Sequence, residues 1–207
     1  MDSAGGSVAL GRDTKKYGIL RLRGKMLNCL KAEDENVYAN EEVKMLLYAL
    51  GVDLNHYNPN KLRYGKIAIL VDPDDDGSHI ALLILANLWR LCPQLVKEGR
   101  VYWLRSPLFI EQDKDKKPIS WYYTDEEFDK VRGTLKGSVK RIKGLGLLNE
   151  YDLKATLFST NGGQVMDKIE YSDEGARVLC ELMGTDIKPR KEFVMNRIDF
   201  SDYGENI

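Results

Sequence analysis

The stretch KIAILVDPDDDGSHI, residues 66–80, ends an apolar run in four aspartates within five residues, followed by a glycine. Ile67–Val71 shows no alternation of apolar and polar residues, which predicts a strand, Lys66–Asp72, that is buried on both faces. After Gly77, apolar residues recur at roughly helical spacing, so the aspartates fall between a buried strand and a helix. Open α/β sheets carry their binding sites at this position. A solvated acidic turn is the simpler interpretation, but carboxylates clustered there favour a bound cation.

Three kinds of site fit part of this pattern. Asp72-x-Asp74-x-Asp76-Gly77 matches the first half of a calcium-binding EF-hand loop, but the twelfth position is Leu83 instead of glutamate and a strand precedes it. The nucleophile motif of haloacid-dehalogenase-type phosphotransferases has Thr or Val where this chain has Asp76. The third candidate is the magnesium-binding strand end of nucleic-acid strand-transfer domains. Magnesium keeps most of its waters, so it suits a site that also binds a phosphate oxygen.

Length and charge limit the classes of protein. The chain has 207 residues, enough for one large or two small domains, and 43% are hydrophobic, so a core can form. The 31 basic and 32 acidic residues give a net charge of −1. Any contact with nucleic acid must therefore come from local basic clusters and not from a positive field over the whole surface.

Cysteine usage and the opening residues predict a cytoplasmic location, in a bacterium or in a phage-infected host. Cys29, Cys92 and Cys180 are widely spaced and form no CxxC pair, which is typical of a reduced compartment and gives no zinc signal. The opening residues lack the apolar segment of a signal peptide. The longest apolar stretch, Ile80–Leu88, is too short to span a bilayer, so no membrane association is expected.

Local signals predict an α/β fold with a smaller α+β segment after it. Asn40 is a candidate N-cap for a helix that ends at Gly51. The other expected elements are a short strand over Tyr17–Leu22, a long helix to about Lys97 interrupted near Pro93, strands over Val101–Leu104 and after Pro107, a hairpin tip at Asp113–Lys117, a helix after a Thr124–Glu127 capping box, a strand over Val139–Lys143, and helices opening at Asn149, Ser172 and Lys188. The alternation of strand and helix fades near residue 107, which predicts two domains, 1–107 and 108–207.

Five motifs occur in order along the chain: DSAGGSVALGRD (2–13), LRGKMLN (22–28), KLRYGKIAILVDPDDDGSHI (61–80), RIKGLGLLN (141–149) and MGTDIKPRKEF (183–193). Together they resemble the C-terminal half of the gyrase B subunit and its type IIA topoisomerase relatives. The resemblance covers nearly the whole chain and is specific, because the motifs keep both their order and their spacing.

The resemblance implies a Toprim fold, a parallel sheet flanked by helices that binds Mg²⁺ at its strand ends, followed by a tail that contacts DNA and a partner subunit. It implies that a tyrosine of a gyrase-A-type partner attacks a phosphate of double-stranded DNA, while the Toprim magnesium stabilises charge. It further implies that ATP is used by a separate ATPase domain or chain. Neither half of such an enzyme cleaves DNA alone.

The family pattern also implies roles for individual residues. Asp72 and Asp74 correspond to direct metal ligands, and Asp76 to a third carboxylate that acts through water or as an orienter. We expect these three to converge on one side of an extended strand end, with Asp75 pointing away as a solvated turn residue. The residues that the resemblance places near DNA are Arg23, Lys25, Asn28, His79 and Lys143. His79 equally fits a hydrogen bond at the helix start.

The sequence departs from the family at several positions. Arg21 replaces a usual proline, and Leu147 and Leu148 replace a usual Glu-Met pair. The family's first Toprim strand ends in Glu-Gly-Asp-Ser-Ala-Gly-Gly-Ser, whereas this sequence opens with Met1-Asp2-Ser3, without that glutamate and strand. Either the chain was shortened there or the gene is split, as in some bacteriophage topoisomerases. We expect a split, in which another chain supplies the ATPase domain, the strand and its glutamate.

These observations predict a magnesium-binding subunit of an ATP-dependent type IIA DNA topoisomerase that is inactive alone and supports reversible double-strand cleavage and strand passage. A free-standing Toprim nuclease or primase-like enzyme is one alternative, but such proteins lack the LRGK, KGLG and MGTDIKPR motifs. The other alternative is a non-catalytic DNA-binding assembly module. It is favoured by the missing glutamate and disfavoured by the clustered aspartates, which repel one another without a cation.

Overall fold

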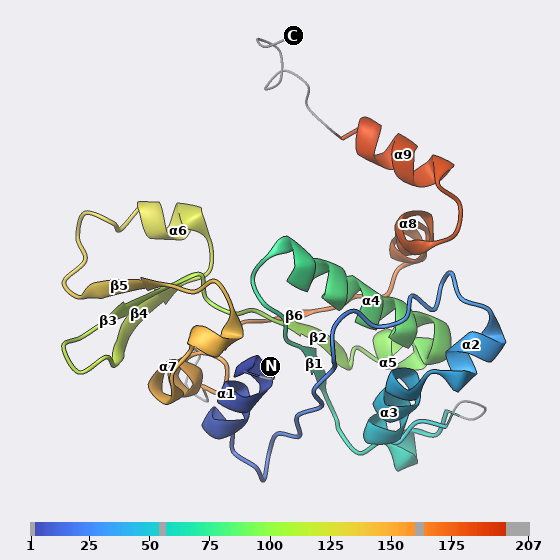
Figure 1. Ribbon diagram of the computed structural model, residues 1–207, viewed down its shortest axis with the longest axis horizontal. Helices are drawn as coiled ribbons and strands as arrows, with labels where there is room; N and C mark the ends of the chain where they lie inside the picture. Colours follow the sequence, from blue (N-terminus) through green and yellow to red (C-terminus); the bar gives the residue numbers. More distant parts are fainter. Residues whose placement is uncertain (1–2, 54–56, 160–163, 198–207) are drawn as a thin grey trace.

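The structure is a computed structural model that describes residues 3–53, 57–159 and 164–197. Its elements follow in chain order (Figure 1): α1 (Ser3–Gly11), α2 (Asp34–Ala39), α3 (Glu41–Leu50), η1 (Pro59–Lys61), β1 (Ile67–Ile69), α4 (Asp75–Leu91), α5 (Pro93–Lys97), β2 (Val101–Leu104), β3 (Phe109–Gln112), β4 (Pro118–Tyr122), α6 (Asp125–Asp129), β5 (Ser138–Arg141), η2 (Leu145–Leu147), α7 (Glu150–Ala155), β6 (Met166–Lys168), α8 (Asp173–Met183) and α9 (Lys188–Met195). Two small sheets organise these elements, and we call the parts built on them the first and the second lobe.

The first lobe contains the sheet β1-β2-β6, with α2–α5 and α8 around it. β1 and β2 pair in parallel, as expected, with Ile67 opposite Val101. β6 comes from the C-terminal half and adds in antiparallel register, with Trp103 opposite Asp167. The α/β class predicted from the sequence is confirmed, but the described sheet is mixed and not purely parallel.

The strand before the aspartates is shorter and less buried than predicted. β1 covers Ile67–Ile69 instead of Lys66–Asp72, and Ala68 is exposed while Ile69 is buried. The prediction of burial on both faces was therefore wrong. The physical reason is that successive side chains of a strand point to opposite faces: Ile69 packs into the helical core on one face, and Ala68 on the other face is left exposed.

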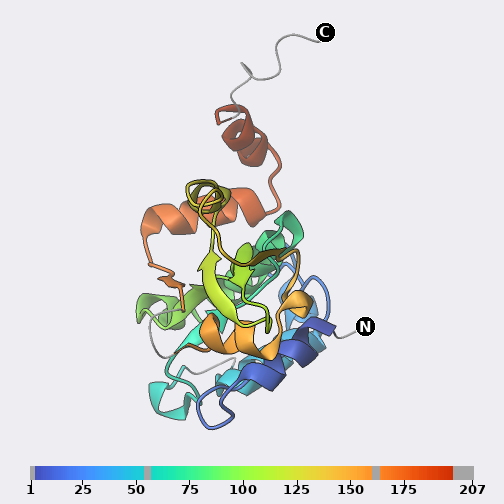
Figure 2. The same cartoon turned by 90° about the vertical axis from the view of Figure 1, so that its left-hand side faces the viewer.

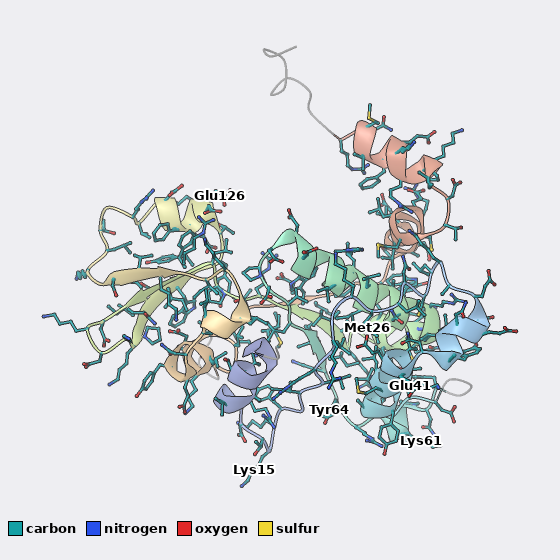
Figure 3. All side chains as sticks on the ribbon, viewed as in Figure 1. Lys15, Met26, Glu41, Lys61, Tyr64 and Glu126 are labelled. Carbon is teal, nitrogen blue, oxygen red and sulfur yellow. The ribbon has the colours of Figure 1, made fainter. Side chains whose placement is uncertain are left out.

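The helices of the first lobe follow their local signals. The Asn40 side chain accepts a hydrogen bond from the amide of Val43, and Gly51 ends α3 in the left-handed region at φ 78°. The long helix breaks at Cys92, and Pro93 opens α5. The apolar faces of α3, α4 and α5 meet in one core that includes the buried side chains of Val43, Leu46, Leu47, Leu88, Leu95 and Val101. Met26, which Figure 3 labels, belongs to the same core.

The second lobe is the antiparallel sheet β4-β3-β5 with α6 and α7. A hairpin joins β3 to β4, and its tip at Asp113–Lys117 is mostly exposed, as predicted. Thr124 caps α6 by accepting from the amide of Glu127, but the Glu127 carboxylate accepts from Tyr123 and not from the cap residue. Phe128 of α6 stacks on Phe109 at a centroid distance of 4.1 Å and covers one face of the sheet.

α1 lies between the two lobes (Figure 1) and packs against η2 and α7, and Figure 2 shows it beside α7. Val8 of α1 is buried in a second core with Leu145, Leu148 and Leu153. The glycine-rich opening segment is thus a packed helix that meets the segment after β5. At Gly11, an added Cβ would stand 2.6 Å from the Cβ of Leu153, so the close approach of α1 and α7 requires a glycine there.

Two further expectations can be compared with the structure. Tyr17–Leu22 forms no strand, so that prediction was wrong, because the segment crosses the surface beside α1 without pairing to another strand. The connection near residue 107 does separate the two sheets, but β6 and α8 return to the first lobe. The division into 1–107 and 108–207 stays a prediction. None of the helices in the described ranges combines the length and apolar character needed to cross a bilayer.

Candidate metal and nucleic-acid site

Three of the four clustered aspartates belong to the start of α4. Asp74 is the N-cap residue and its Oδ1 accepts a hydrogen bond from the amide of Gly77 at 2.7 Å, while Asp75 and Asp76 lie in the first turn. Unpaired amide groups and the helix dipole make that end electropositive. The helix start therefore offsets part of the repulsion between the carboxylates. The predicted extended arrangement of Asp72, Asp74 and Asp76 was wrong, because the chain turns into the helix at Asp74.

Gly77 is needed because the helix start packs directly onto Asp72. A Cβ at Gly77 would stand 2.1 Å from the carbonyl oxygen of Asp72 and 3.0 Å from its carbonyl carbon. Gly77 is buried, and its amide is the one that Asp74 caps. Gly77 thus keeps Asp72 and Asp74, the two expected direct metal ligands, close together: its Cα packs on the backbone of Asp72, and its amide donates to the side chain of Asp74.

Asp72 joins this helix start to the KGLG motif, 73 residues later in the chain. Its Oδ1 accepts a hydrogen bond from the amide of Leu145 at 2.7 Å. Gly144 stands beside the same carboxylate, since a Cβ there would lie 3.4 Å from Oδ1. Backbone of the second lobe therefore orients one of the carboxylates of the first.

Asp76 joins the helix start to the LRGK motif. Lys25 Nζ lies 2.8 Å from Asp76 Oδ1, and the two side chains are 49% and 78% exposed. The ammonium group of Lys25 lowers the pKa of Asp76, first through the hydrogen bond and then through its charge, and His79 adds a smaller effect in the same direction. Asp76 is consequently held as a carboxylate at the surface.

The other predicted DNA-contact residues divide into two groups. Asn28 is engaged inside the protein: its Nδ2 donates to the carbonyl of Met183 at 2.9 Å, which links LRGKMLN to the MGTDIKPR segment. The backbone amide of Arg23 donates to Glu42 Oε1, so the Arg23 loop is attached to α3. His79 and Lys143 are exposed. Asp75, which we expected to face the solvent, is also exposed and lies in the first turn of α4.

The carboxylates do not form a complete metal cage in the described residues, where no group of three or more His, Cys, Asp or Glu side chains is arranged to hold a metal ion. Asp72, Asp74 and Asp76 each accept a hydrogen bond from one protein donor there. Magnesium does not need such a cage, because it binds through one or two carboxylates, its own waters and phosphate oxygens. The oxygen donors of Asp72 and Asp74 fit that requirement.

Sequence reasoning missed the groups that hold the site together. The Leu145 amide and the Met183 carbonyl are backbone atoms, and no residue type marks them in a sequence. The capping role of Asp74 had a signal, because an aspartate three residues before Gly77 at a helix start is a common N-cap pattern.

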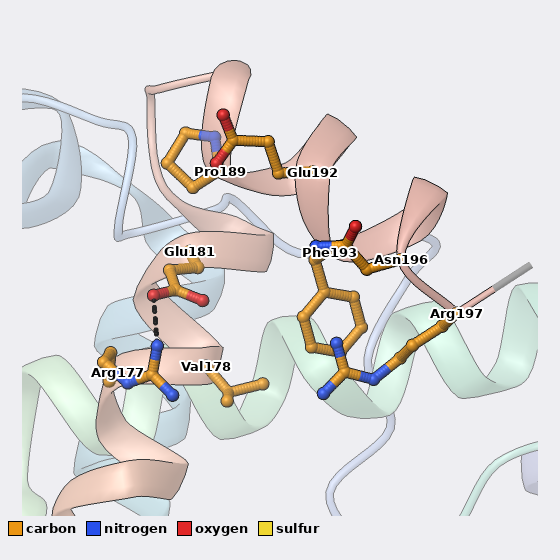
Figure 4. Close-up of a pocket in the computed structure, with 8 residues that line it drawn as sticks. All are labelled: Arg177, Val178, Glu181, Pro189, Glu192, Phe193, Asn196 and Arg197. Atoms are coloured by element: carbon orange, nitrogen blue, oxygen red, sulfur yellow. Dashed lines mark hydrogen bonds and ion pairs between the residues drawn. The ribbon is translucent and has the colours of Figure 1, made fainter.

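A shallow pocket of about 230 Å³ lies away from this site, between α8 and α9 (Figure 4). Arg177 pairs with Glu181 on its α8 side, and Arg197 lies 3.6 Å over the ring of Phe193 on its α9 side. These contacts are internal to the two helices, so we assign the pocket no part in the candidate site.

Comparison with known proteins matches this geometry to a family. The Toprim domain family matches residues 1–105 of the chain, a range that contains Lys25 and the aspartates.

Two curated relatives extend the similarity to the second lobe. The B subunit of DNA topoisomerase 4 from Staphylococcus aureus is 34% identical over 206 residues, which cover 96% of this chain and 31% of the relative. The B subunit of DNA gyrase from Thermus thermophilus is 36% identical over 211 residues, which cover 97% of this chain and 33% of the relative. The chain thus spans about a third of the length of these relatives.

A solved structure shows the same fold. The DNA-binding, cleavage and re-ligation domain of Plasmodium falciparum topoisomerase II superposes with a TM-score of 0.77 at 26% identity, over 94% of this chain and 27% of that one. The family resemblance found in the sequence is confirmed by these matches.

Proposed function

Because the chain belongs to the Toprim family, we propose that it is the Toprim-containing, magnesium-binding part of an ATP-dependent type IIA DNA topoisomerase. Both relatives named above are B subunits of type II topoisomerases, and the matched structure is described as a DNA-binding, cleavage and re-ligation domain. In this proposal, a gyrase-A-type partner supplies the tyrosine that attacks DNA, and another domain or chain hydrolyses ATP. The enzyme acts on double-stranded DNA in the cytoplasm.

The observation that carries the proposal is the meeting of three motifs at the start of α4. Asp72 is bonded to the Leu145 amide of KGLG, and Asp76 to Lys25 of LRGK. These contacts bridge 73 and 51 residues, so the fold brings carboxylates, a lysine and a glycine-rich loop together. A solvated acidic turn has no need of such partners.

Asp72 and Asp74 would hold Mg²⁺ there, with Asp76 as the third carboxylate. Bound magnesium would neutralise charge on a DNA phosphate during transesterification, a reaction that depends on charge neutralisation and positioning more than on a strong base. The protein's own part is orientation. Leu145 fixes the Asp72 carboxylate, and Gly77 holds Asp74 beside it.

The exposed basic residues would position the DNA backbone. Lys25 and Lys143 are exposed lysines on the LRGK and KGLG segments, and their ammonium groups can reach phosphate oxygens. His79 is exposed in the first turn of α4, and Arg23 is exposed on the LRGK loop. The side-chain amide of Asn28, by contrast, donates to the carbonyl of Met183, so we propose that Asn28 shapes the LRGK loop and does not contact DNA.

The test is DNA cleavage by the enzyme reassembled with a gyrase-A-type subunit and an ATPase-bearing chain. Asp72→Asn and Asp74→Asn should each abolish magnesium-dependent cleavage, because the ligand charge is lost while the size of the side chain is kept. Asp75→Asn is the matched control and should cleave much as the wild type does, since Asp75 is exposed and outside the proposed ligand set. Wild-type cleavage by the Asp72 or Asp74 variant would show that the metal assignment is wrong.

A non-catalytic DNA-binding module is the second candidate. One observation favours it: the described residues form no cluster of three metal-ligating side chains. In that case the reassembled complex should bind DNA equally well with Asp72 and with Asn at position 72, and no cleavage should appear with the wild type under any magnesium concentration.

We further propose that a partner segment adds a strand beside β1 and supplies a glutamate to the site. In the described residues, β1 pairs with β2 along one edge only, and Ala68 is exposed. Strand addition to such an edge needs only backbone hydrogen bonds. A polypeptide that ends in the family's Glu-bearing strand should raise the melting temperature and support cleavage. Its Glu→Ala form should keep the stabilisation but lose the cleavage.

A further inference from the structure

Lys25 and Asp76 form an ion pair that joins two proposed binding functions. The pair connects the LRGK loop with the first turn of α4, and its Nζ–Oδ1 distance is 2.8 Å. Lys25 is half exposed and Asp76 is more exposed still, so water and ligands reach both groups. Neither side chain is committed to the protein core.

Each member of the pair is also a proposed binding group for a ligand. This inference rests on the proposed function, in which Asp76 contributes to magnesium binding and Lys25 to phosphate binding. An ammonium group on Asp76 Oδ1 opposes the approach of a second cation to the same carboxylate. Conversely, a lysine held by a carboxylate is less available to a phosphate. The four-carbon stem of lysine lets its ammonium group swing between two nearby anions.

We propose that Lys25 is a shared cation that passes between Asp76 and a DNA phosphate, and that it thereby couples the binding of DNA and magnesium. In the protein without DNA, Lys25 occupies Asp76 and weakens magnesium binding. When DNA binds, its phosphate takes the ammonium group, and Asp76 becomes available to the metal ion.

The coupling must act equally in both directions. If DNA increases the affinity for magnesium by some factor, magnesium increases the affinity for DNA by the same factor. Exposed ion pairs are weak, so the factor carried by Lys25 should be about two- to fivefold. Lys25 is therefore a positioning residue for Asp76, with an effect that is visible in binding before any cleavage occurs.

The experiment is a magnesium titration of the full chain, with and without a short DNA duplex. Binding is monitored by NMR from the backbone amide signals of Asp76 and Gly77. These signals report on the site itself, so ions that DNA gathers elsewhere do not contribute. Lys25→Met keeps the length of the side chain and removes its charge. Lys31→Met is the matched control, because Lys31 is exposed in the same segment and its side chain makes no ion pair among the described residues. Thermal unfolding verifies that both variants are folded.

In the wild type and the Lys31 variant, DNA should increase magnesium affinity by at least about two- to fivefold. Lys25→Met should bind magnesium about two- to fivefold more tightly than the wild type without DNA, and the factor by which DNA increases its magnesium affinity should be about two- to fivefold smaller than in the wild type, because only the direct contact between phosphate and metal ion is left. Equal DNA-dependent factors in the wild type and Lys25→Met would overturn the coupling but leave the metal site in place. A wild-type chain whose signals do not respond to magnesium, with or without DNA, would overturn the proposed metal site together with the coupling.

Discussion

Carboxylates in the two lobes are bound in opposite ways. In the second lobe, Asp152 is fully buried and accepts from Gln112 Nε2, Lys140 Nζ and the Asn149 amide at 2.9, 3.1 and 3.0 Å. At the start of α4, Asp76 is exposed and has one partner in the described residues, Lys25. The first arrangement satisfies a charge permanently, while the second leaves it available for exchange.

The difference separates carboxylates that build the fold from those that can serve a ligand. A buried charge is tolerated only when several donors surround it, and those donors leave it no capacity for a metal ion. The aspartates of the candidate site are satisfied partly by the helix start and partly by single donors. Changes in the second lobe should therefore affect stability most, and changes at the site should affect binding and cleavage.

The largest loss of stability is expected for Asp152→Ala. The change removes three hydrogen bonds, one of which belongs to the capping box of α7, and it leaves Lys140 and Gln112 without their buried acceptor. We expect the free energy of unfolding to fall by about 3 kcal/mol, measured by urea denaturation. Asp129→Ala is the control, because Asp129 is exposed with a long 4.0 Å ion pair, and should change stability by less than about 0.5 kcal/mol. Equal losses in the two variants would contradict the distinction between carboxylates that are buried among several donors and those that are exposed.

Glu111→Ala should have the next largest effect. Glu111 is buried in β3, where its Oε1 accepts from the amides of Lys136 and Gly137 and its Oε2 from the Ser120 hydroxyl. Truncation leaves both amides unsatisfied, so we expect a loss of about 2 kcal/mol, again measured by urea denaturation. Glu111→Gln is the matched control and keeps an oxygen for the two amides.

The same residue predicts a dependence on pH. The Ser120 hydroxyl bond, followed by the two amide bonds, lowers the pKa of Glu111. The folded state therefore binds the proton less readily than the unfolded state, whose pKa is about 4.3. The stability contributed by Glu111 is complete above that value and is lost as the pH falls through the lower folded-state pKa. Glu111→Gln should flatten this acid-side decline in the melting temperature, and an unchanged decline would contradict the assignment.

Asp74 sharpens the comparison because it caps α4 and is also a proposed metal ligand. Asp74→Ala removes the N-cap of α4 and should cost about 1 kcal/mol. Asp74→Asn keeps a capping oxygen and should change the free energy of unfolding by less than about 0.5 kcal/mol. It should nevertheless abolish cleavage in the reassembled enzyme. If both variants lose the same stability, the cap is not the source of the loss.

The smallest effects on stability are expected for Lys25→Ala and Lys143→Ala, each within about 0.5 kcal/mol, because both side chains are exposed. Their effect should appear in DNA binding. If each contacts one phosphate, the slope of log affinity against log salt should fall by up to about one unit, measured by fluorescence anisotropy. Unchanged slopes in both variants would make them ordinary surface lysines.

The sequence predicted those parts of the fold that local chemistry decides. Asn40 and Gly51 bounded α3, Pro93 marked the break after α4, and Asn149 opened α7. The family resemblance also selected the segments that meet at the site. These predictions succeeded because caps, breakers and motif order are properties of neighbouring residues.

Parts that depend on distant residues could not be predicted. Tyr17–Leu22 has an apolar pattern suited to a strand but pairs with no strand in the part of the chain that the structure describes. The position of Asp72 depends on a backbone amide 73 residues away, and β6 joins a sheet whose other strands lie far earlier in the chain. Lys25 was expected at DNA, and no feature of its segment revealed that Asp76 holds it.

The antiparallel return of β6 determines the order in which the chain can finish folding. Trp103 pairs with Asp167, 64 residues later, and β3, β4 and β5 lie between them. During synthesis the hairpin-rich second lobe is made, and can pair within itself, before β6 exists. The first sheet consequently keeps an unpaired edge on β2 until residue 168 has been added, and closing the intervening loop is a slow, non-local step. The first lobe would thus mature last, although most of its residues are synthesised first.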